Sequence, residues 1–479
     1  MDLTRPLEGK IIVREINGAC LPIEAFPRFV SQNNLFFLDS ALQIKGIARY
    51  SFLGFNPFLI IKTKHRKVTL ICGEELTEFE GNPFEAFRSI LRRFKIKDAE
   101  RVPIPFQCGA VGYFSYDLCH FIEKLPNKSV DDLYLPDIYF GFYDAIISYD
   151  NFLGKCYVIG IESDWNSTIK DRMNQIVDVL CEKFDACDES LGYKQTQWIC
   201  ETPLKFNFAK DQYINAIRRI KDYIASGDVY QVNLSQRIET KVDIPSYELY
   251  KILRLMNPAP FSCYLKFDDI AVVSSSPERF LNVTGRHVQT RPIKGTRPRG
   301  EDTVADEVMK HALLTSPKDD AELTMIIDLE RNDLGRVCDY GSVKVVEKKV
   351  LESFSTVHHL VSTVEGNLHE RHDLIDLLKA TFPGGSITGA PKIRAMQIID
   401  ELELTKRSVY TGSIGYIGFN GNADLNIAIR TFIMKGSNVY FQVGSGIVAD
   451  SNEYEEYEET MHKAKALIES LKPCLTLSS

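Results

Sequence analysis

The sequence lacks several features that would assign a protein class directly. No segment approaches the roughly 20 apolar residues that span a membrane, and the first residues lack the basic-then-apolar plan of a signal peptide. There is no long Lys/Arg run, and the net charge is −8, so nucleic acid is not expected as the main partner. The eleven cysteines never form Cys-x-x-Cys, which argues against a zinc site or a disulfide framework. We therefore expect a cytoplasmic protein.

The negative charge has a consequence for any anionic ligand. An acidic protein must gather positive charge locally, or use a metal, to bind an anion. P-loop, ferredoxin and zinc-protease motifs are missing, so no familiar cofactor motif supplies that charge.

The length of 479 residues allows two or three domains or one large intertwined core. A polar stretch of low periodicity, 184–205, indicates a linker. It divides the chain into an N-terminal region, 1–183, and a C-terminal region, 206–472.

Periodicity predicts several elements within these regions. Strands are predicted for 58–63 and 139–148, and helices for 166–182 and 208–226. The glycine-rich segment 109–114 is echoed by 412–417, which suggests two strands in related roles.

The segment 290–300 contains the most informative single residue, Lys294. The motif Pro-Ile-Lys-Gly-Thr predicts a tight turn between a strand and a loop that is rich in arginine. A catalytic lysine must be neutral, so it needs burial or nearby positive charge to lower its pKa. Arg291, Arg297 and Arg299 are candidates for that charge, and equally for holding an anionic substrate. Taken alone, the motif also fits an ordinary solvated turn.

Two further segments, 229–238 and 423–432, alternate apolar and polar residues as strands do. One face of the first carries Gln231, and the polar face of the second carries Arg430. Such polar faces suit a sheet that lines a cleft, although a solvated face is the alternative.

Two helices place carboxylates on one face. The first begins after Ser316, with Asp319 and Glu322 three residues apart; the second begins near Asn452 and carries Glu456 and Glu459. If these pairs converge, they form an all-oxygen site suited to Mg²⁺. The alternative is an acidic, solvated helix start.

Two glycine-rich segments, 382–392 and 443–447, are predicted to form turns with anion-binding backbone N–H groups.

Taken together, these segments resemble the chorismate-utilising enzymes, which include anthranilate synthase component I, aminodeoxychorismate synthase component I, and the isochorismate and salicylate synthases. The resemblance extends from about 208 to 468. Its motifs are SSPERF at 275–280, PIKGT at 292–296, DLERNDLGR at 328–336, VHHL at 357–360, GGSITGAPK at 384–392 and GIVADS at 446–451. A weaker match covers RYSFLG at 49–54 and GYFSYDL at 112–118.

The resemblance implies a fold, a metal and a set of site residues. The fold is a large α+β assembly of two mainly antiparallel sheets flanked by helices, in which both regions share one core. The implied catalytic residues are Lys294, Glu278 as acid/base, and His359. The implied Mg²⁺ site consists of Glu322 and Glu459, with Asp319 and Glu456 as water-bridged partners. The implied substrate-binding residues are Arg430, Tyr416, Lys463, Gly446 and Thr388.

Two positions distinguish members of the family. Gln231 stands where isochorismate and salicylate synthases carry a lysine that activates water, which argues against water as the nucleophile. Lys294 stands where anthranilate synthases have alanine, and it is typical of aminodeoxychorismate synthases. There the lysine is thought to form a covalent adduct with chorismate before ammonia adds. The sequence contains nothing like a glutaminase nucleophile motif, so the ammonia is expected from a separate glutamine amidotransferase subunit.

Two alternatives remain open at this stage. One is anthranilate synthase component I. The other is a non-catalytic regulatory relative that binds an amino acid in its N-terminal region. Ser40 and the segment Arg49, Tyr50 and Ser51 loosely resemble the tryptophan site of related first domains.

Overall fold

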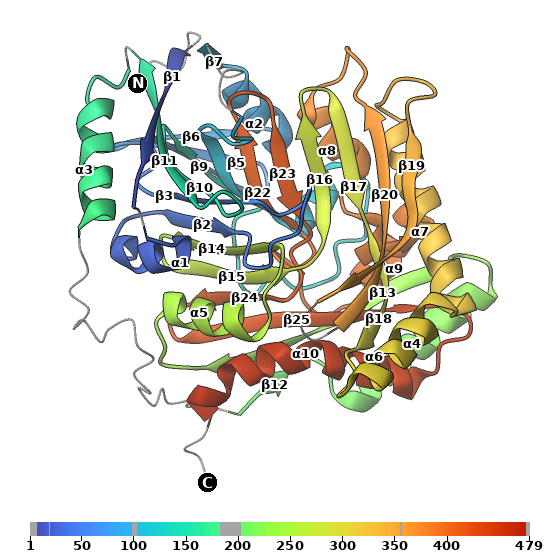
Figure 1. The fold of residues 1–479 in the computed structure, drawn as a ribbon. Coiled ribbons are helices and arrows are strands. Elements are labelled where there is room, and N and C mark those ends of the chain that lie inside the picture. Colours follow the sequence, from blue (N-terminus) through green and yellow to red (C-terminus); the bar gives the residue numbers. More distant parts are fainter. Residues whose placement is uncertain are drawn as a thin grey trace.

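Two large sheets packed against each other, with helices outside them, form the molecule (Figure 1). The computed structural model describes residues 7–18, 20–97, 103–163, 165–182, 203–354 and 357–475. The predicted linker, 184–205, lies almost wholly outside the described residues. All strand pairings between described strands are antiparallel except that of β1 with β7. The predicted α+β fold class is confirmed.

The first sheet joins strands from both regions of the chain. Its order is β12 (Lys205–Phe206), β13 (Gln231–Lys241), β25 (Asn438–Ile447), β24 (Thr431–Lys435), β15 (Ile270–Ser276), β14 (Phe261–Phe267), β2 (Leu35–Asp39), β3 (Tyr50–Gly54), β10 (Ala145–Asp150), β11 (Lys155–Ser163), β1 (Leu7–Ile16) and β7 (Phe94–Lys97), with β21 (Gly389–Ala390) beside β13.

The second sheet also joins strands from both regions of the chain. Its order is β18 (Ile293–Pro298), β20 (Val357–Asn367), β17 (His287–Arg291), β16 (Arg279–Thr284), β23 (Ala423–Asn426), β22 (Ser413–Gly418), β8 (Gly109–Phe114), β9 (Ile138–Tyr143), β4 (Leu59–Lys64), β5 (Lys67–Cys72) and β6 (Glu75–Glu80), with β19 (Lys344–Ser353) beside β20.

Helices cover the outside of both sheets, and α4, α6 and α10 gather at the lower edge in Figure 1. The helices are α1 (Pro22–Ala25), α2 (Pro83–Leu91), α3 (Ile169–Cys181), α4 (Lys210–Ala225), α5 (Ser246–Met256), α6 (Thr303–Leu314), α7 (Pro317–Gly335), α8 (Leu374–Thr381), α9 (Lys392–Leu402) and α10 (Glu453–Leu475), with short 3₁₀ turns η1 (Phe26–Phe29), η3 (Tyr116–Phe121) and η4 (Gly385–Ile387). No helix of the described residues is both long and apolar enough to cross a membrane.

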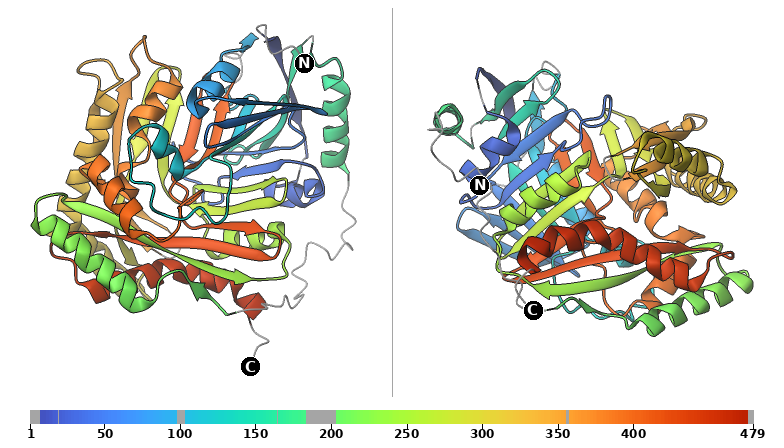
Figure 2. Two further views of the ribbon diagram at one scale, coloured as in Figure 1. Left: turned by 180° about the vertical axis from the view of Figure 1, so that it is seen from behind. Right: turned by 60° about the horizontal axis from the view of Figure 1, so that its bottom comes forward.

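The two regions share both sheets. β14 pairs with β2 in the first sheet, and β22 pairs with β8 in the second. The two glycine-rich segments that echo each other in the sequence are therefore neighbours in space, with Gly415 opposite Gly112. Figure 2 shows from two further sides that the early (blue) and late (red) strands lie side by side.

Most predicted elements are confirmed, but two predicted strands are split. The run 139–148 is β9 and β10, which belong to different sheets. The run 423–432 is β23 and β24, which also lie in different sheets, with Arg430 in a left-handed conformation between them (φ +52°). A chain that passes from one sheet to the other must bend, and alternation of residue types does not register such a bend.

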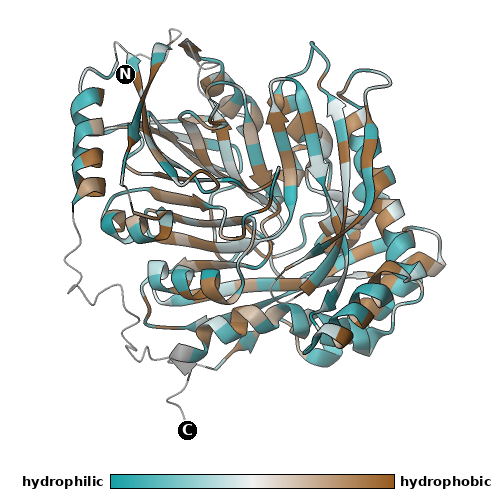
Figure 3. Ribbon diagram, in the orientation of Figure 1, coloured by the Kyte–Doolittle hydropathy of each residue, from teal (hydrophilic) through white to brown (hydrophobic). Residues whose placement is uncertain are grey.

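The hydropathy pattern explains the layers. Interior strands are largely brown in Figure 3, whereas α4, α6 and α10 carry teal and brown side by side. In α7, Leu323, Ile326 and Leu334 are buried as predicted, and Ser316 caps the helix by accepting a hydrogen bond from the backbone N–H of Asp319 (3.2 Å).

Candidate active site

Lys294 lies on β18, near α7 and α10. We predicted a tight turn here, and the structure corrects this to a bulged strand. β18 pairs with β20, and the register shifts between Lys294 and Thr296. Gly295 adopts φ +75°, and a Cβ there would lie 3.0 Å from a carboxylate oxygen of Asp319. The bulge re-aims the lysine side chain, as bulges near functional sites commonly do.

Burial lowers the pKa of the Lys294 amine, and the positive charge of Lys463 lowers it further. The carboxylates of Glu322, Glu278 and Glu459 oppose that shift. Lys294 is therefore an amine surrounded by the expected acid/base and metal-binding groups, with a pKa below that of a free lysine.

The three arginines near the motif do not supply this charge in the way we predicted, because each is engaged by a protein carboxylate. The pairs are Arg291 with Glu352 (2.9 Å), Arg297 with Asp319 (2.7 Å) and Arg299 with Asp306 (2.6 Å).

Gly446 lies on β25, where this strand pairs with β13 close to Gln231 and Lys294. We predicted a turn over 443–447, but these residues belong to β25, where Gly446 pairs with Asn233 of β13. A Cβ at Gly446 would lie 2.8 Å from the amide nitrogen of Gln231 and 3.2 Å from Nζ of Lys294. A larger residue at this position would have to displace both side chains.

The amide of Gln231 is buried, and neither its nitrogen nor its oxygen has a hydrogen-bond partner among the described residues. A buried polar group without a partner costs about 1–3 kcal/mol. The arrangement fits an amide that meets a bound ligand.

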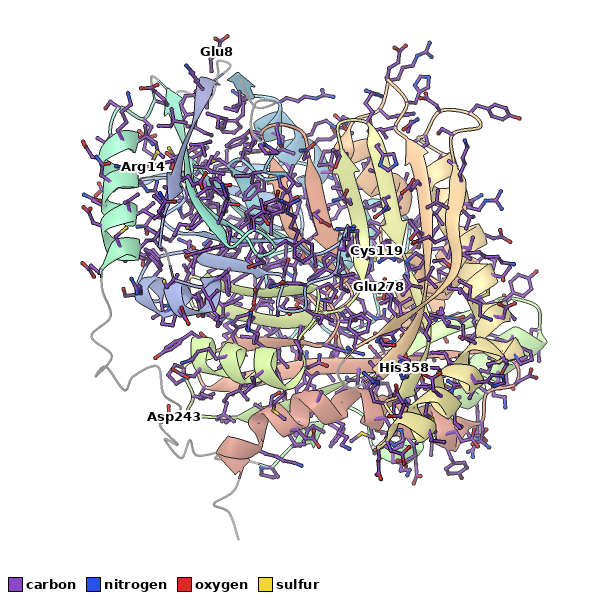
Figure 4. All side chains as sticks on the ribbon, viewed as in Figure 1. Glu8, Arg14, Cys119, Asp243, Glu278 and His358 are labelled. Atoms are coloured by element: carbon purple, nitrogen blue, oxygen red, sulfur yellow. The ribbon has the colours of Figure 1, made fainter. Side chains whose placement is uncertain are left out.

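Glu278 lies at the junction of β15 and β16, in the interior of the molecule (Figure 4). Ser386 Oγ donates a hydrogen bond of 2.5 Å to its Oε1, and the backbone N–H of Ile293 approaches the same atom at 3.4 Å. Burial raises the pKa of Glu278 to about 7, although both hydrogen bonds favour the ionised form. The carboxyl is thus suited to give or take a proton near neutral pH.

His359, on β20, links β18 to Arg430. A guanidinium NH2 group of Arg430 lies 3.3 Å from Nε2 of the histidine, and Thr296 Oγ1 lies 2.8 Å from Nδ1. Arginine only donates, so Nε2 accepts and Nδ1 carries the proton. Burial and the charge of Arg430 hold the pKa of His359 well below its usual value, so the ring is neutral.

Arg430 itself is half-buried, which corrects the alternative of a solvated face. Burial lowers its pKa to about 10. A desolvated guanidinium beside a neutral histidine is a strong site for a carboxylate.

The two carboxylate pairs face each other across α7 and α10. Burial raises the pKa of Glu322, and the negative charges of Asp319 and Glu456 add to this rise. Glu459 is nearly half exposed, and Lys463, which donates to it at 2.7 Å, lowers its pKa. These effects indicate that the carboxylates of α7 and α10 lie near one another.

Protein cations already accompany the deeper two carboxylates. Asp319 pairs with Arg297, and Nζ of Lys318 lies 3.7 Å from Glu456. Among the described residues, no three His, Cys, Asp or Glu side chains are placed to hold a metal together. Mg²⁺ commonly uses only one or two protein carboxylates, with water and substrate oxygens completing its shell. The donor chemistry of Glu322 and Glu459 therefore fits this ion.

The segment 384–392 forms η4 and β21 before α9 begins. Thr388 is fully buried, and its hydroxyl donates to the carbonyl of Gly384 (2.9 Å). Its own carbonyl accepts from the N–H of Asn233 (2.8 Å), which ties the turn to β13. The hydrogen bonds of Thr388 therefore stabilise the turn. Lys463, on α10, donates to the carbonyl of Gly444 (3.0 Å).

Tyr416 lies elsewhere. It lines a separate cavity of about 550 Å³ between the sheets, together with Ser40, Arg49 and Tyr50. Its ring stacks on Phe106 with centroids 4.5 Å apart. The predicted role in binding the substrate at Lys294 does not fit this position.

The residues predicted to bind an amino acid lie in or next to the same cavity. Ser40 Oγ donates to the carbonyl of Tyr50 (2.7 Å), and Arg49 pairs with Asp150 (2.9 Å). Ser51 stands directly behind, donating to Asp39 (3.1 Å).

Sequence reasoning missed several residues that support the site. They are Ser386, Thr296, Glu330 and Arg407. Ser386, Thr296 and Glu330 lie inside motifs identified in the sequence, but a motif does not say that Ser386 contacts Glu278 or that Glu330 contacts Gly385.

Comparisons with known proteins agree with this geometry. A family model described as chorismate binding enzyme matches residues 43–469. Aminodeoxychorismate synthase component 1 of Bacillus subtilis is 40% identical over 438 residues, 88% of this chain and 89% of the relative. Anthranilate synthase component 1 of Acetivibrio thermocellus is 39% identical over 461 residues, 94% and 92% of the two chains. The crystal structure of anthranilate synthase component I from Streptococcus pneumoniae matches with a TM-score of 0.77 at 31% identity, covering 94% of this chain and 98% of that one. The chain therefore belongs to the family of chorismate-binding enzymes.

Proposed function

We propose that the chain is component I of an aminodeoxychorismate synthase, which converts chorismate and ammonia into 4-amino-4-deoxychorismate and water. The observation that carries the proposal is the setting of Lys294. Its pKa is lowered by burial and by the positive charge of Lys463, although the carboxylates of Glu322, Glu278 and Glu459 oppose this shift. A lysine with a lowered pKa is a usable nucleophile.

The proposed reaction has two allylic displacements. The neutral amine of Lys294 bonds to C2 of chorismate, both ring double bonds shift by one position around the ring, and the C4–O bond breaks. Glu278 gives the proton with which the hydroxyl leaves as water. Ammonia then bonds to C4, both double bonds shift back, and the C2–N bond breaks to release the neutral amine of Lys294. The new ammonium group returns a proton to Glu278, and the enolpyruvyl ether stays intact.

The remaining residues bind and orient the substrate dianion. Arg430, with the neutral His359 beside it, and Lys463 supply positive charge for the carboxylates. Gln231 takes the place of the lysine that activates water in isochorismate and salicylate synthases, which favours ammonia as the nucleophile. Gly446 leaves the space that the substrate and both neighbouring side chains need.

Magnesium is the proposed cofactor, held by Glu322 and Glu459 with Asp319 and Glu456 behind them. When bound, it supplies positive charge for the ring carboxylate of chorismate. Burial raises the pKa of Glu322, and the neighbouring carboxylates of Asp319 and Glu456 raise it further, which supports a cation at this place.

A separate glutamine amidotransferase subunit is the proposed source of ammonia, because the chain has no glutaminase nucleophile motif of its own. The product would feed a lyase that forms p-aminobenzoate for folate synthesis.

Anthranilate synthase component I is the second candidate, because a relative with that name is 39% identical to this chain. In that reaction ammonia adds at C2 and pyruvate leaves, so Lys294 has no covalent task. The separate cavity lined by Ser40, Arg49 and Tyr50 supports a further proposal, that tryptophan binds there as an inhibitor or a structural ligand.

Lys294→Ala tests the covalent role. The variant should lose formation of 4-amino-4-deoxychorismate from chorismate and ammonium, with some C2-aminated product in its place. Lys344→Ala, an exposed lysine of β19, is the matched control and should behave as the wild type. Intact-protein mass spectrometry of the wild type with chorismate but without ammonia should detect an adduct that Lys294→Ala lacks. Unchanged C4 amination in Lys294→Ala refutes the covalent role.

A further inference from the structure

Three consecutive residues of η4 each make a buried contact in a different direction. The backbone N–H of Gly385 donates to Glu330 Oε1 on α7 (3.0 Å). Ser386 Oγ donates to Glu278 Oε1 (2.5 Å). The carbonyl of Ile387 accepts from a guanidinium NH1 group of Arg407 (2.9 Å). The residue that contacts Glu278 is thus flanked on both sides by residues held by buried charged groups.

The contact with Glu330 is tight. A Cβ added at Gly385 would lie 2.9 Å from Glu330 Oε1 and 2.7 Å from a methyl group of Leu329, so the turn lies directly on α7. Glu330 is almost fully buried, and its second oxygen has no partner among the described residues. A buried carboxyl is expensive to keep, and nothing in the proposed reaction uses this one.

Arg407 is equally fixed on the other side. Its Nε and NH2 groups donate to both oxygens of Glu403 (2.9 and 2.7 Å), and NH2 also donates to the carbonyl of Asn233 (2.7 Å). The guanidinium lies 4.7 Å from the ring centre of Tyr116. A bidentate pair with this many partners leaves the arginine little freedom.

The orientation of Glu278 depends on this turn, because its other hydrogen bond, from Ile293 N–H, is long at 3.4 Å. Building on the acid/base role proposed for Glu278, we infer that Ser386 is a positioning residue that fixes the orientation of the Glu278 carboxyl, and that Glu330 and Arg407 hold Ser386 in place. The free-energy cost of burying the Glu330 carboxyl is then explained by its role in fixing the turn that positions Glu278.

Ser386→Ala tests this inference. Without the hydroxyl, Glu278 loses its short hydrogen bond, and a misplacement of about 1 Å costs about 100-fold in rate. We expect kcat to fall about 10- to 100-fold while KM for chorismate changes less than about three-fold. The basic limb of the kcat/KM–pH profile should move to higher pH, because a donor that stabilises the carboxylate is lost. Ser386→Thr should restore both, and Ser148→Ala, a buried serine of β10 whose hydroxyl has no described partner, should match the wild type.

Glu330 provides the second variant pair. Glu330→Gln keeps an acceptor for Gly385 N–H and should stay near wild type, whereas Glu330→Ala should lower kcat as Ser386→Ala does. In the double variant Ser386→Ala/Glu330→Ala the losses should not add, because both act through one turn. Should Glu330→Ala fail to fold, the Ser386 series alone decides.

Two results overturn the inference: a kcat of Ser386→Ala within two-fold of wild type with an unmoved pH profile, or an effect confined to KM, which makes Ser386 a substrate contact instead. All rates are read as consumption of chorismate. The comparison therefore stands whichever product the wild type makes, and failure of the proposed function is recognised separately from the wild-type product.

Discussion

Gly446→Ala is a sharp test of the candidate site, because one methyl group would meet both Gln231 and Lys294. The added Cβ would lie 2.8 Å from the Gln231 amide nitrogen and 3.2 Å from Lys294 Nζ, against 3.4 Å for an ordinary contact. The amide must therefore retreat by at least 0.6 Å and the amine by at least 0.2 Å. The backbone at Gly446 is not left-handed, so alanine brings no strain of its own.

The expected effect separates function from folding. Both contacted atoms are the ends of flexible side chains, so the loss of stability should be near the lower end of overpacking, about 1 kcal/mol. A misplacement of about 1 Å costs about 100-fold in rate, so the smaller shifts of Gln231 and Lys294 should together lower the rate about 10-fold.

Initial rates of chorismate consumption with saturating ammonium, together with thermal unfolding, measure the two effects. Gly335→Ala is the matched control, since it lies at the end of α7 and no atom lies within 4 Å of an added Cβ. That variant should keep full activity. If Gly446→Ala also keeps full activity, Gln231 and Lys294 do not act from the positions described.

Three further predictions address the acid, the metal and the second cavity. Burial raises the pKa of Glu278 from 4.5 to about 7, so the stability that this carboxyl contributes in its protonated form is lost as the pH rises between these values. At about 1.4 kcal/mol per pKa unit, Glu278→Gln should be about 3 kcal/mol more stable than the wild type at pH 8 and little different at pH 4. Thermal unfolding of both proteins across this pH range checks the prediction. Glu459→Gln should weaken Mg²⁺ binding several-fold in titration calorimetry and make turnover more dependent on metal concentration; indifference to the metal contradicts the site between α7 and α10. L-Tryptophan, but not D-tryptophan, should raise the unfolding temperature, and Arg49→Ala should reduce that rise, whereas equal shifts in both proteins place the ligand outside this cavity.

The sequence predicts the local elements well and their junctions less well. Capping by Ser316 and the apolar spacing of α7 are local properties, and both are confirmed. The prediction of one continuous strand over 139–148 is wrong at Asp144, where the chain passes from one sheet to the other. The alternation of residue types has the same period before and after this bend, so it does not reveal the bend.

The candidate site shows the same division. Spacing along each helix predicts that Asp319 shares a face with Glu322, but it does not predict that α7 meets α10, which only the resemblance implied. The predicted substrate-binding role of Tyr416 does not fit its position, because successive residues of a strand face opposite sides of the sheet. In β22, Tyr416 packs into one hydrophobic cluster and Ile417 into another, so a step of one position moves a side chain to the other face of the strand.

Product identification tests the central claim most directly. The purified chain receives chorismate, Mg²⁺ and ammonium at mildly alkaline pH, with and without an aminodeoxychorismate lyase, and the products are separated by chromatography and identified by mass spectrometry. C4 amination through Lys294 predicts p-aminobenzoate only when the lyase is present, and no anthranilate. Direct formation of anthranilate and pyruvate would contradict it and make the chain an anthranilate synthase in spite of Lys294.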